Sequence, residues 1–527
     1  MNRRRGLASL IVACSLLATG CSGSSTPAAT SSAASTGAPQ SGGTLTFLFP
    51  TAPLDMDPST SQDNNVSMPL WNAWFEELVG FDGTNYTPLL AKAWTTTDGG
   101  KTYTFNLDER AKFSDGSQMT AEDVLFSLKR TMGPDVSLLN FLKAKVSSMT
   151  APDPQTVSIS LTEPWPHLLA DLAGPNGAIY SKAAFEKLND AKKFFASTPV
   201  GTGPYTLGAI SANSSYEANR SSGYWRTEAA PYLDKILFQV VTDESARVTA
   251  VVGGRADLAQ QPPPNQLATL KSNTDVTVYA FPAARVEVFA LNTRQAPFNN
   301  LALRQAFSLA MDRTAIVQTG LFGYGDPATT FLVGPPSQTF QNPSLDLYPT
   351  DLEKAKALIA SSGVPTPIMV PMTVSTGADQ DAILTIAQAN LEKVGFKVVP
   401  SRKDAASVDN DIIGKAFTAN TTFWGNVSGD PAIQPLFTID PNYCCEAYFT
   451  GFDDPALVAL TKQAIAESDA AKAQPIWDDV QRQVADAAFV VPLYNPQLTY
   501  LSTNSVHGFE ASPGGFYNWA GIWKSGG

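Results

Sequence analysis

The 527-residue sequence contains only two histidines, His167 and His507, and four cysteines. A Ser-His-Asp triad or a histidine metal site therefore has few residues to draw on. The G-x-S-x-G motif of serine hydrolases does not occur, and Gly99–Thr102 lacks the first glycine of a phosphate-binding loop. We expect both histidines to be structural. We also expect no catalytic residue, no metal site, no cofactor and no enzyme activity.

Basic residues are scarce as well. The chain has 36 Lys and Arg against 48 Asp and Glu, which gives a formal charge of −12. Loss of the amino-terminal segment would remove Arg3, Arg4 and Arg5 and no acid, and so would make the charge more negative by three. Nucleic acid recognition needs a positive surface. The composition therefore predicts no nucleic acid partner.

The amino-terminal segment is typical of an exported protein. MNRRR precedes the apolar run Leu7–Thr19, which is too short to span a membrane, so residues 1–20 are predicted to be a signal peptide. Cys21 follows L-L-A-T-G, which resembles a bacterial lipobox, although Ala18 stands where a leucine is usual. We expect Cys21 to be lipidated and to anchor the protein to the outer face of the cell membrane. The alternative is an ordinary signal peptide cleaved near Ala18.

Residues 21–43 after the predicted anchor form a linker. Only Ser, Gly, Thr, Ala, Pro and Gln occur between Ser22 and Gly43, and such a composition cannot build a core. A flexible chain of this length reaches roughly 25 Å on average. The segment is therefore expected to be the tether of a lipid-anchored protein.

The last two cysteines, Cys444 and Cys445, are adjacent. Neighbouring Cα atoms lie about 3.8 Å apart, below the usual range for a disulfide, so a vicinal bridge would be strained but can form in an exported protein. No histidine lies near the pair in the sequence. We expect a structural or ligand-platform role, with the two thiols either reduced or bridged.

The stretch from Tyr86 to Arg130 carries the clearest local signals. Asp98-Gly99-Gly100 is a turn leading into Tyr103, Phe105 and Leu107, which alternate with polar residues as in a half-buried strand. Thr120 then opens T-A-E-D, a capping box, and an amphipathic helix follows. The stretch is therefore predicted to form a hairpin followed by a helix.

This stretch, LAKAW…DGGKTYTFNL…FSDG…TAEDV, closely resembles a segment of the extracytoplasmic solute-binding proteins of peptide- and nickel-type ABC importers, called family 5. PVGTGPY at residues 199–205 and APFNNLALRQAFSLAMDR at residues 296–313 resemble two further segments of that family. The resemblance implies an α/β fold like that of periplasmic binding proteins, with two hinged lobes and an additional subdomain inserted in the first lobe.

Alternating helix and strand signals through the rest of the chain agree with two α/β lobes. The length and the 43% hydrophobic content allow more than one core. Crossings between the lobes are expected near Ala290 and Pro492, where they would form a hinge. Lobe I is predicted to consist of three segments, residues 44–85, 201–288 and 492–527. The inserted subdomain is predicted at residues 86–200 and lobe II at residues 289–491.

The segment TFWGNVSGDP, from Thr422 to Pro431, resembles the family's cleft segment G-W-x-x-D-x-x-D-P. In the family, one aspartate of this segment holds the α-amino group of a peptide. Asn426 or Val427 occupies that position here, depending on a one-residue shift, and neither supplies a full charge. The resemblance implies that Trp424 covers the ligand while Gly425 and its neighbours offer backbone groups. The full predicted site is Gln62, Asn64, Asn292, Trp424, Gly425, Asn426, Val427 and Tyr494.

The resemblance implies a substrate-binding lipoprotein that captures an oligopeptide or peptide-like solute and delivers it to the permease subunits of an ABC importer. We expect a monomer. Glycosides and metal chelates are alternative cargoes. A further alternative is an envelope lipoprotein, scaffold or regulator, that keeps the fold without transport, and the replaced aspartate is the only hint of it.

The predicted anchor can be tested at Cys21. Cys21→Ser should move the protein from the membrane fraction to the soluble fraction, because the lipid supplies the affinity for the bilayer. Cell fractionation with immunoblotting measures the shift. A variant that stays with the membrane would show that another anchor exists.

Overall fold

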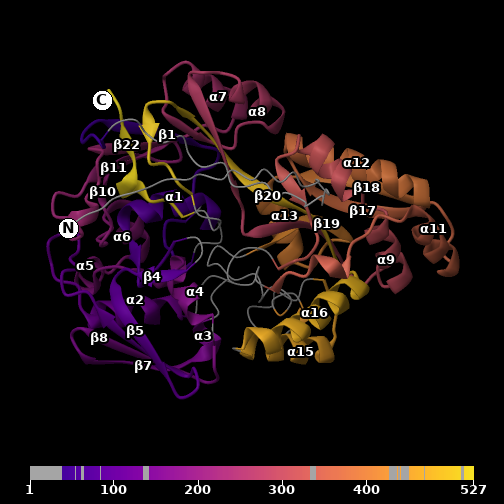
Figure 1. Cartoon of the computed structure of the whole chain (residues 1–527), viewed down its shortest axis with the longest axis horizontal. Coiled ribbons are helices and arrows are strands. Elements are labelled where there is room, and N and C mark those ends of the chain that lie inside the picture. Colours follow the sequence, from indigo (N-terminus) through magenta and orange to yellow (C-terminus); the bar gives the residue numbers. More distant parts are fainter. Residues whose placement is uncertain are drawn as a thin grey trace, which may run out of the picture. The chain divides into compact units, whose positions relative to one another are not determined.

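A large mixed sheet organises the chain from Pro39 to Gly527, which forms one compact unit (Figure 1). The computed structural model describes residues 38–53, 55–60, 64–82, 85–133, 142–165, 167–332, 340–425, 436, 439–440, 450–467, 469–511 and 516–526. The predicted signal peptide, Cys21 and most of the predicted tether lie outside these residues.

The described portion of this sheet has twelve strands. They are β1 (Thr44–Phe49), β10 (Tyr205–Ser211), β11 (Ser215–Arg220), β12 (Lys235–Val240), β13 (Leu258–Gln260), β14 (Val276–Pro282), β15 (Arg285–Leu291), β16 (Gly325–Pro327), β17 (Ile368–Ser375), β18 (Phe396–Lys403), β19 (Ala419–Gly425) and β20 (Val490–Thr503). Their order is β10-β11-β12-β1-β13-β20-β15-β19-β17-β18, and β14 and β16 also pair with β20.

Strand β20 belongs to two sections of this sheet. Its carboxyl-terminal half, Gln497–Thr503, pairs antiparallel with β14, and its amino-terminal residues pair antiparallel with β15. Only Ala283 and Ala284 separate β14 from β15. Two neighbouring stretches of chain therefore cross from the first section (β10–β14 and β1) to the second (β15–β19). The predicted crossings near Ala290 and Pro492 fall in β15 and β20, whereas the predicted domain boundaries remain predictions.

Helices cover both sections (Figure 1). The α-helices are α1 (Asn64–Trp74), α2 (Ala121–Thr131), α3 (Leu142–Lys145), α4 (Leu168–Leu172), α5 (Lys182–Leu188), α6 (Ala191–Ser197), α7 (Glu244–Val252), α8 (Pro264–Lys271), α9 (Leu301–Leu309), α10 (Arg313–Ala315), α11 (Leu352–Ser361), α12 (Ala378–Val394), α13 (Ala405–Ile413), α15 (Pro455–Ala466) and α16 (Ala470–Ala487). Short 3-10 or π turns lie at Pro175–Gly177, Thr227–Ala229, Ile316–Gly320, Pro343–Leu345 and Trp519–Gly521.

Aspartates fix where many of these helices begin. Among the described helices, the side chains of seven N-cap aspartates accept hydrogen bonds from backbone amides of the first turn; they are Asp190, Asp243, Asp312, Asp351, Asp404, Asp454 and Asp469. Each cap satisfies a donor that the helix cannot pair and places a negative charge at its positive end. In α2, the Thr120 amide donates to Asp123 Oδ2 at 3.0 Å, which confirms the predicted capping box.

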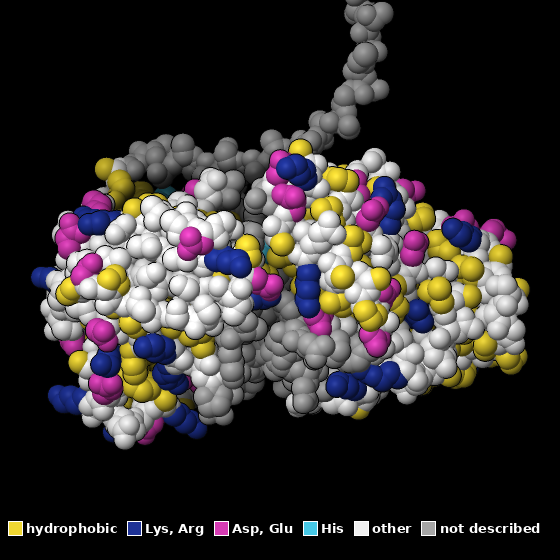
Figure 2. Space-filling model, turned by 90° about the horizontal axis from the view of Figure 1, so that it is seen from below, with side chains coloured by type: hydrophobic (Ala, Val, Ile, Leu, Met, Phe, Trp, Pro, Cys, Tyr) yellow, Lys and Arg dark blue, Asp and Glu magenta, His cyan; other side chains and the backbone are white. Residues whose placement is uncertain are grey.

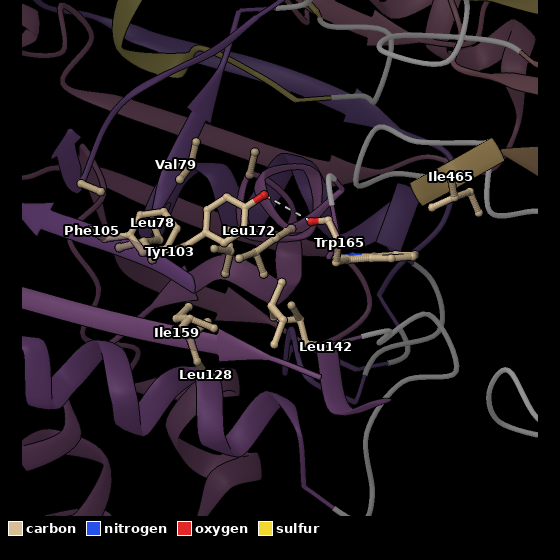
Figure 3. Packing of buried hydrophobic residues seen from close by; sticks show 14 of the residues in the cluster. Leu78, Val79, Tyr103, Phe105, Leu128, Leu142, Ile159, Trp165, Leu172 and Ile465 are labelled. Atoms are coloured by element: carbon tan, nitrogen blue, oxygen red, sulfur yellow. Dashed lines mark hydrogen bonds between the residues drawn. The ribbon is translucent and has the colours of Figure 1, made fainter. Parts of the chain in front are cut away.

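The hairpin predicted around Asp98–Gly100 is also present, and all three turn residues have positive φ. Its strands belong to a small sheet ordered β5 (Ala91–Thr97), β6 (Thr102–Leu107), β8 (Thr156–Leu161) and β7 (Val146–Asp153). Figure 3 shows Tyr103, Phe105, Ile159 and Leu128 packed in its core, with the Tyr103 hydroxyl donating to the Trp165 carbonyl at 3.4 Å. Short strands elsewhere are β2 (Glu76–Glu77), β3 (Val79–Phe81), β4 (Tyr86–Pro88), β9 (Ala178–Ile179), β21 (Val506–His507) and β22 (Trp523–Lys524).

Two adjacent glutamates of β2 are buried beneath the first section. Glu76 accepts hydrogen bonds from Tyr224 Oη at 2.6 Å and Trp225 Nε1 at 2.7 Å. Glu77 accepts one from Asn72 Nδ2 at 3.2 Å. Burial raises the pKa of Glu77 to about 8, and the charge of Glu76 adds to that shift. Glu77 therefore binds a proton on folding at neutral pH.

The raised pKa of Glu77 predicts a pH-dependent penalty. The unfolded chain loses this proton near the ordinary pKa of 4.5, whereas the folded protein keeps it up to about pH 8. The contribution of Glu77 to the free energy of unfolding therefore decreases as the pH rises from about 4.5 to about 8. Glu77→Gln removes the ionisable group. The free energy of unfolding of the variant should rise relative to the parent across this window, by at most about 1.4 kcal/mol per pH unit.

Urea unfolding between pH 4 and pH 9 measures this difference. The matched control is Glu122→Gln, because Glu122 is an exposed glutamate in the first turn of α2. A Glu77→Gln variant whose stability relative to the parent does not change with pH would contradict the assignment.

Candidate ligand-binding site

Three parallel strands of the second section end at one edge of the sheet. β17 runs parallel to both β18 and β19, and α12 begins just after β17. In α/β sheets, ligands bind outside the carboxyl ends of such strands. A ligand site is therefore expected at this edge.

Strand β15 runs in the opposite direction and brings the hinge residues to the same edge. Gly425 pairs with Arg285, Trp424 with Val286 and Phe423 with Glu287. On its other side, Glu287 pairs with Tyr494 of β20. The backbone thus brings three predicted site residues, Trp424, Gly425 and Tyr494, into a group spanning three neighbouring strands.

Arg285, Glu287 and Tyr494 form the polar portion of this group. Arg285 Nε lies 3.0 Å from Glu287 Oε1, and the Glu287 side chain is only 14% exposed. Burial raises the pKa of Glu287, and Arg285 opposes the shift. Burial, followed by the charge of Glu287, raises the pKa of Tyr494 well above 10, so its hydroxyl stays protonated.

Asp379, in the first turn of α12, adds a second carboxylate to this group. Its charge further raises the pKa of both Glu287 and Tyr494. It also raises the pKa of Glu244, which begins α7 beside the first section and whose pKa is raised chiefly by burial. The charge of Asp379 therefore acts on carboxylates of both sections of the sheet.

Asn292 lies away from this group. It follows Leu291, which pairs with Ala419 at the opposite end of β19 from Trp424. Its side-chain amide is buried and donates to the Phe417 carbonyl at 2.8 Å, a contact that positions the chain entering β19. The structure does not bring Asn292 to Trp424, and its predicted contact with a ligand remains a prediction.

The other predicted residues lie wholly or partly outside the described set. Asn64 begins α1, but its side chain lies outside the described set, as does that of Trp424. Gln62, Asn426, Val427, Cys444 and Cys445 lie outside the described residues altogether.

Sequence reasoning missed Arg285, Glu287 and Asp379. One signal for Glu287 was present, because V-E-V-F-A-L places a glutamate inside an otherwise apolar strand. Nothing local pointed to Asp379, which reads as an ordinary acid in the first turn of a helix.

The described residues indicate no chemistry other than ligand binding. Burial lowers the pKa of His167 to about 3 and keeps the ring neutral, and His507 stacks on Trp523 at 4.1 Å. Among the described residues, no three His, Cys, Asp or Glu side chains are placed to hold a metal ion. Within the same portion of the chain, no helix is long and apolar enough to cross a membrane. On the face seen in Figure 2, acidic and basic side chains are interspersed.

Solved structures share this fold. The chain matches the periplasmic binding protein DppA from Helicobacter pylori in complex with the peptide STSA, with a TM-score of 0.80 and 23% identity over 92% of this chain and 98% of that one. It matches the oligopeptide-binding protein AppA from Bacillus subtilis in complex with a nonapeptide, with a TM-score of 0.81 and 19% identity over 93% of this chain and all of that one. The predicted periplasmic-binding-protein fold is confirmed.

Proteins related in sequence also bind solutes. The glutathione-binding protein GsiB of Escherichia coli K12 is 29% identical over 469 residues, which cover 87% of this chain and 90% of that protein. The relatives found are solute-binding proteins, not enzymes, as predicted. The model of the bacterial extracellular solute-binding proteins, family 5 Middle, matches residues 85–438. The chain therefore belongs to the family 5 bacterial extracellular solute-binding proteins.

Proposed function

We propose that this protein captures a peptide or a peptide-like solute outside the cytoplasm and delivers it to the permease of an ABC importer. The observation that carries the proposal is the near full-length similarity to a glutathione-binding protein. Relatives of the same fold were solved with bound peptides. Glutathione and short peptides share an amino group, amide bonds and a carboxylate, so they define one chemical class of cargo.

The anchor and the lobes complete the proposal. Cys21 is the proposed lipid attachment site and residues 21–43 the proposed tether, which would keep a monomeric binding protein near its permease. The two lobes, with the boundaries given above, would close on the solute about the paired strands β14–β15 and β20.

The proposed ligand platform is the carboxyl end of β19. Trp424 and Gly425 end that strand, and the Asn426 and Val427 that follow would offer backbone groups to an extended ligand. Tyr494 would contribute from β20, with Gln62 and Asn64 from the first lobe.

Calorimetry with purified protein tests this function. The probes are reduced glutathione, the dipeptide Met-Leu, the tetrapeptide Ser-Thr-Ser-Ala and the nonapeptide RPPGFSPFR; the last three are ligands of solved relatives. We expect micromolar or tighter binding of at least one. Agropinic acid and the nickel–histidine complex, bound by other relatives, serve as comparison ligands. Binding of these alone would overturn the proposal.

The role of Trp424 gives a separate prediction. Truncating a central aromatic contact commonly costs about 2 kcal/mol or more, roughly a thirtyfold loss of affinity. Trp424→Ala should therefore weaken binding of the best probe by that factor and leave the melting temperature of the empty protein nearly unchanged.

A core tryptophan would behave in the opposite way, because its truncation typically costs about 3 to 5 kcal/mol of stability. Trp523→Ala is the matched control, since Trp523 is buried against His507 in the first lobe. It should lower the melting temperature and leave the affinity of the folded fraction unchanged. A Trp424→Ala variant that behaves like Trp523→Ala would place Trp424 in the core.

A further inference from the structure

Glu287 is a nearly buried acid whose hydrogen bonding is incomplete. Its ion pair with Arg285 is 3.0 Å long, yet the carboxylate accepts no hydrogen bond from any other residue that the structure describes. By comparison, the buried Glu76 accepts two, from Tyr224 and Trp225. A buried carboxylate with few donors is costly unless another group supplies them.

Tyr494 lies opposite Glu287 in the strand pairing, so the two side chains share one face of the sheet. The residue is 3% exposed, and its hydroxyl is not one of the buried polar atoms without a partner, which include the hydroxyls of Tyr86 and Tyr348. Two neighbouring side chains therefore place a carboxylate and a hydroxyl on one face of the sheet.

Asp379 is a half-buried acid in the first turn of α12, the helix that begins just after β17 ends. Its charge acts on both Glu287 and Tyr494. With Arg285 counted, the group carries a formal charge of −1, so one monovalent cation would neutralise it. A metal ion is disfavoured, because the described residues hold no metal-binding set of acids, cysteines or histidines.

We propose that Glu287, Asp379 and the Tyr494 hydroxyl form a subsite for the protonated amino group of the solute. This inference rests on the proposed function and names the group that the site recognises. An ammonium group has three N–H donors, and the site offers two carboxylates and one hydroxyl as acceptors. The subsite would supply a carboxylate that the segment after Trp424 lacks. By strand register it lies on the face of β19 that carries Phe423, not on the face that carries Trp424.

Calorimetry with a matched probe pair tests the subsite. The probes are Ser-Thr-Ser-Ala and reduced glutathione, each with a free and with an acetylated amino group. Asp379→Asn and Glu287→Gln should each weaken binding of the free probe by about tenfold to a hundredfold, as expected for a lost hydrogen bond to a charged group. Tyr494→Phe, which keeps the buried ring, should cost about threefold to tenfold. The affinity for the acetylated probe should not change in any of the three variants.

The matched control is Asp381→Asn. Asp381 lies one half-turn further along α12 and pairs with Arg402 at 2.7 Å, outside the group. This variant should bind both probes like the parent. Equal losses for free and acetylated probes, or no loss in Asp379→Asn and Glu287→Gln, would overturn the subsite.

A separate readout distinguishes failure of the subsite from failure of the proposed function. The solute retained by the purified parent protein is released by denaturation and identified by mass spectrometry. A retained solute that is not peptide-like but carries an amino group would overturn the proposed cargo and support the subsite. A retained peptide-like solute without a free amino group would do the reverse.

Discussion

The antiparallel pairing of β20 with β14 and β15 is the constraint on which the rest of the structure depends. Backbone hydrogen bonds of β20 hold β13 and β14 in the first section and β15 and β16 in the second. Among the described residues, two adjacent stretches of chain cross between the sections through β14–β15 and β20, and paired strands of this kind can act as a hinge. The same pairing fixes Glu287 opposite Tyr494 and so builds a portion of the candidate site into the hinge.

In the second section, the carboxyl ends of parallel strands create a place for a ligand. Parallel strands β17, β18 and β19 end at one edge, and the first turn of α12 follows directly. In the first section, the Tyr224 hydroxyl donates a hydrogen bond to Glu76. No hydrogen bond of this kind joins Tyr494 to Glu287 among the described residues. Both acids are buried, and of the two only Glu287 lacks a neutral donor among the described residues.

The site also shows why a missing motif residue is weak grounds for rejecting a function. The cleft segment has no aspartate at Asn426 or Val427, a departure from the family's mode of peptide recognition. Carboxylates at Glu287 and Asp379 lie on other strands and helices near the end of the same strand. Charge complementarity depends on where a carboxylate lies in space, not on which segment supplies it.

Local chemistry determined the elements and the family. Positive-φ turn residues fixed the hairpin at Asp98–Gly100, and the Thr120 capping box fixed the start of α2, because both depend on residues close in sequence. The motifs around them were sufficient to indicate a solute-binding protein. The tertiary structure alone decided that Glu287 pairs with Tyr494, that the charge of Asp379 acts on both, and that Asn292 lies at the far end of β19. Strand register and helix placement set these contacts between distant segments, and no local pattern encodes them.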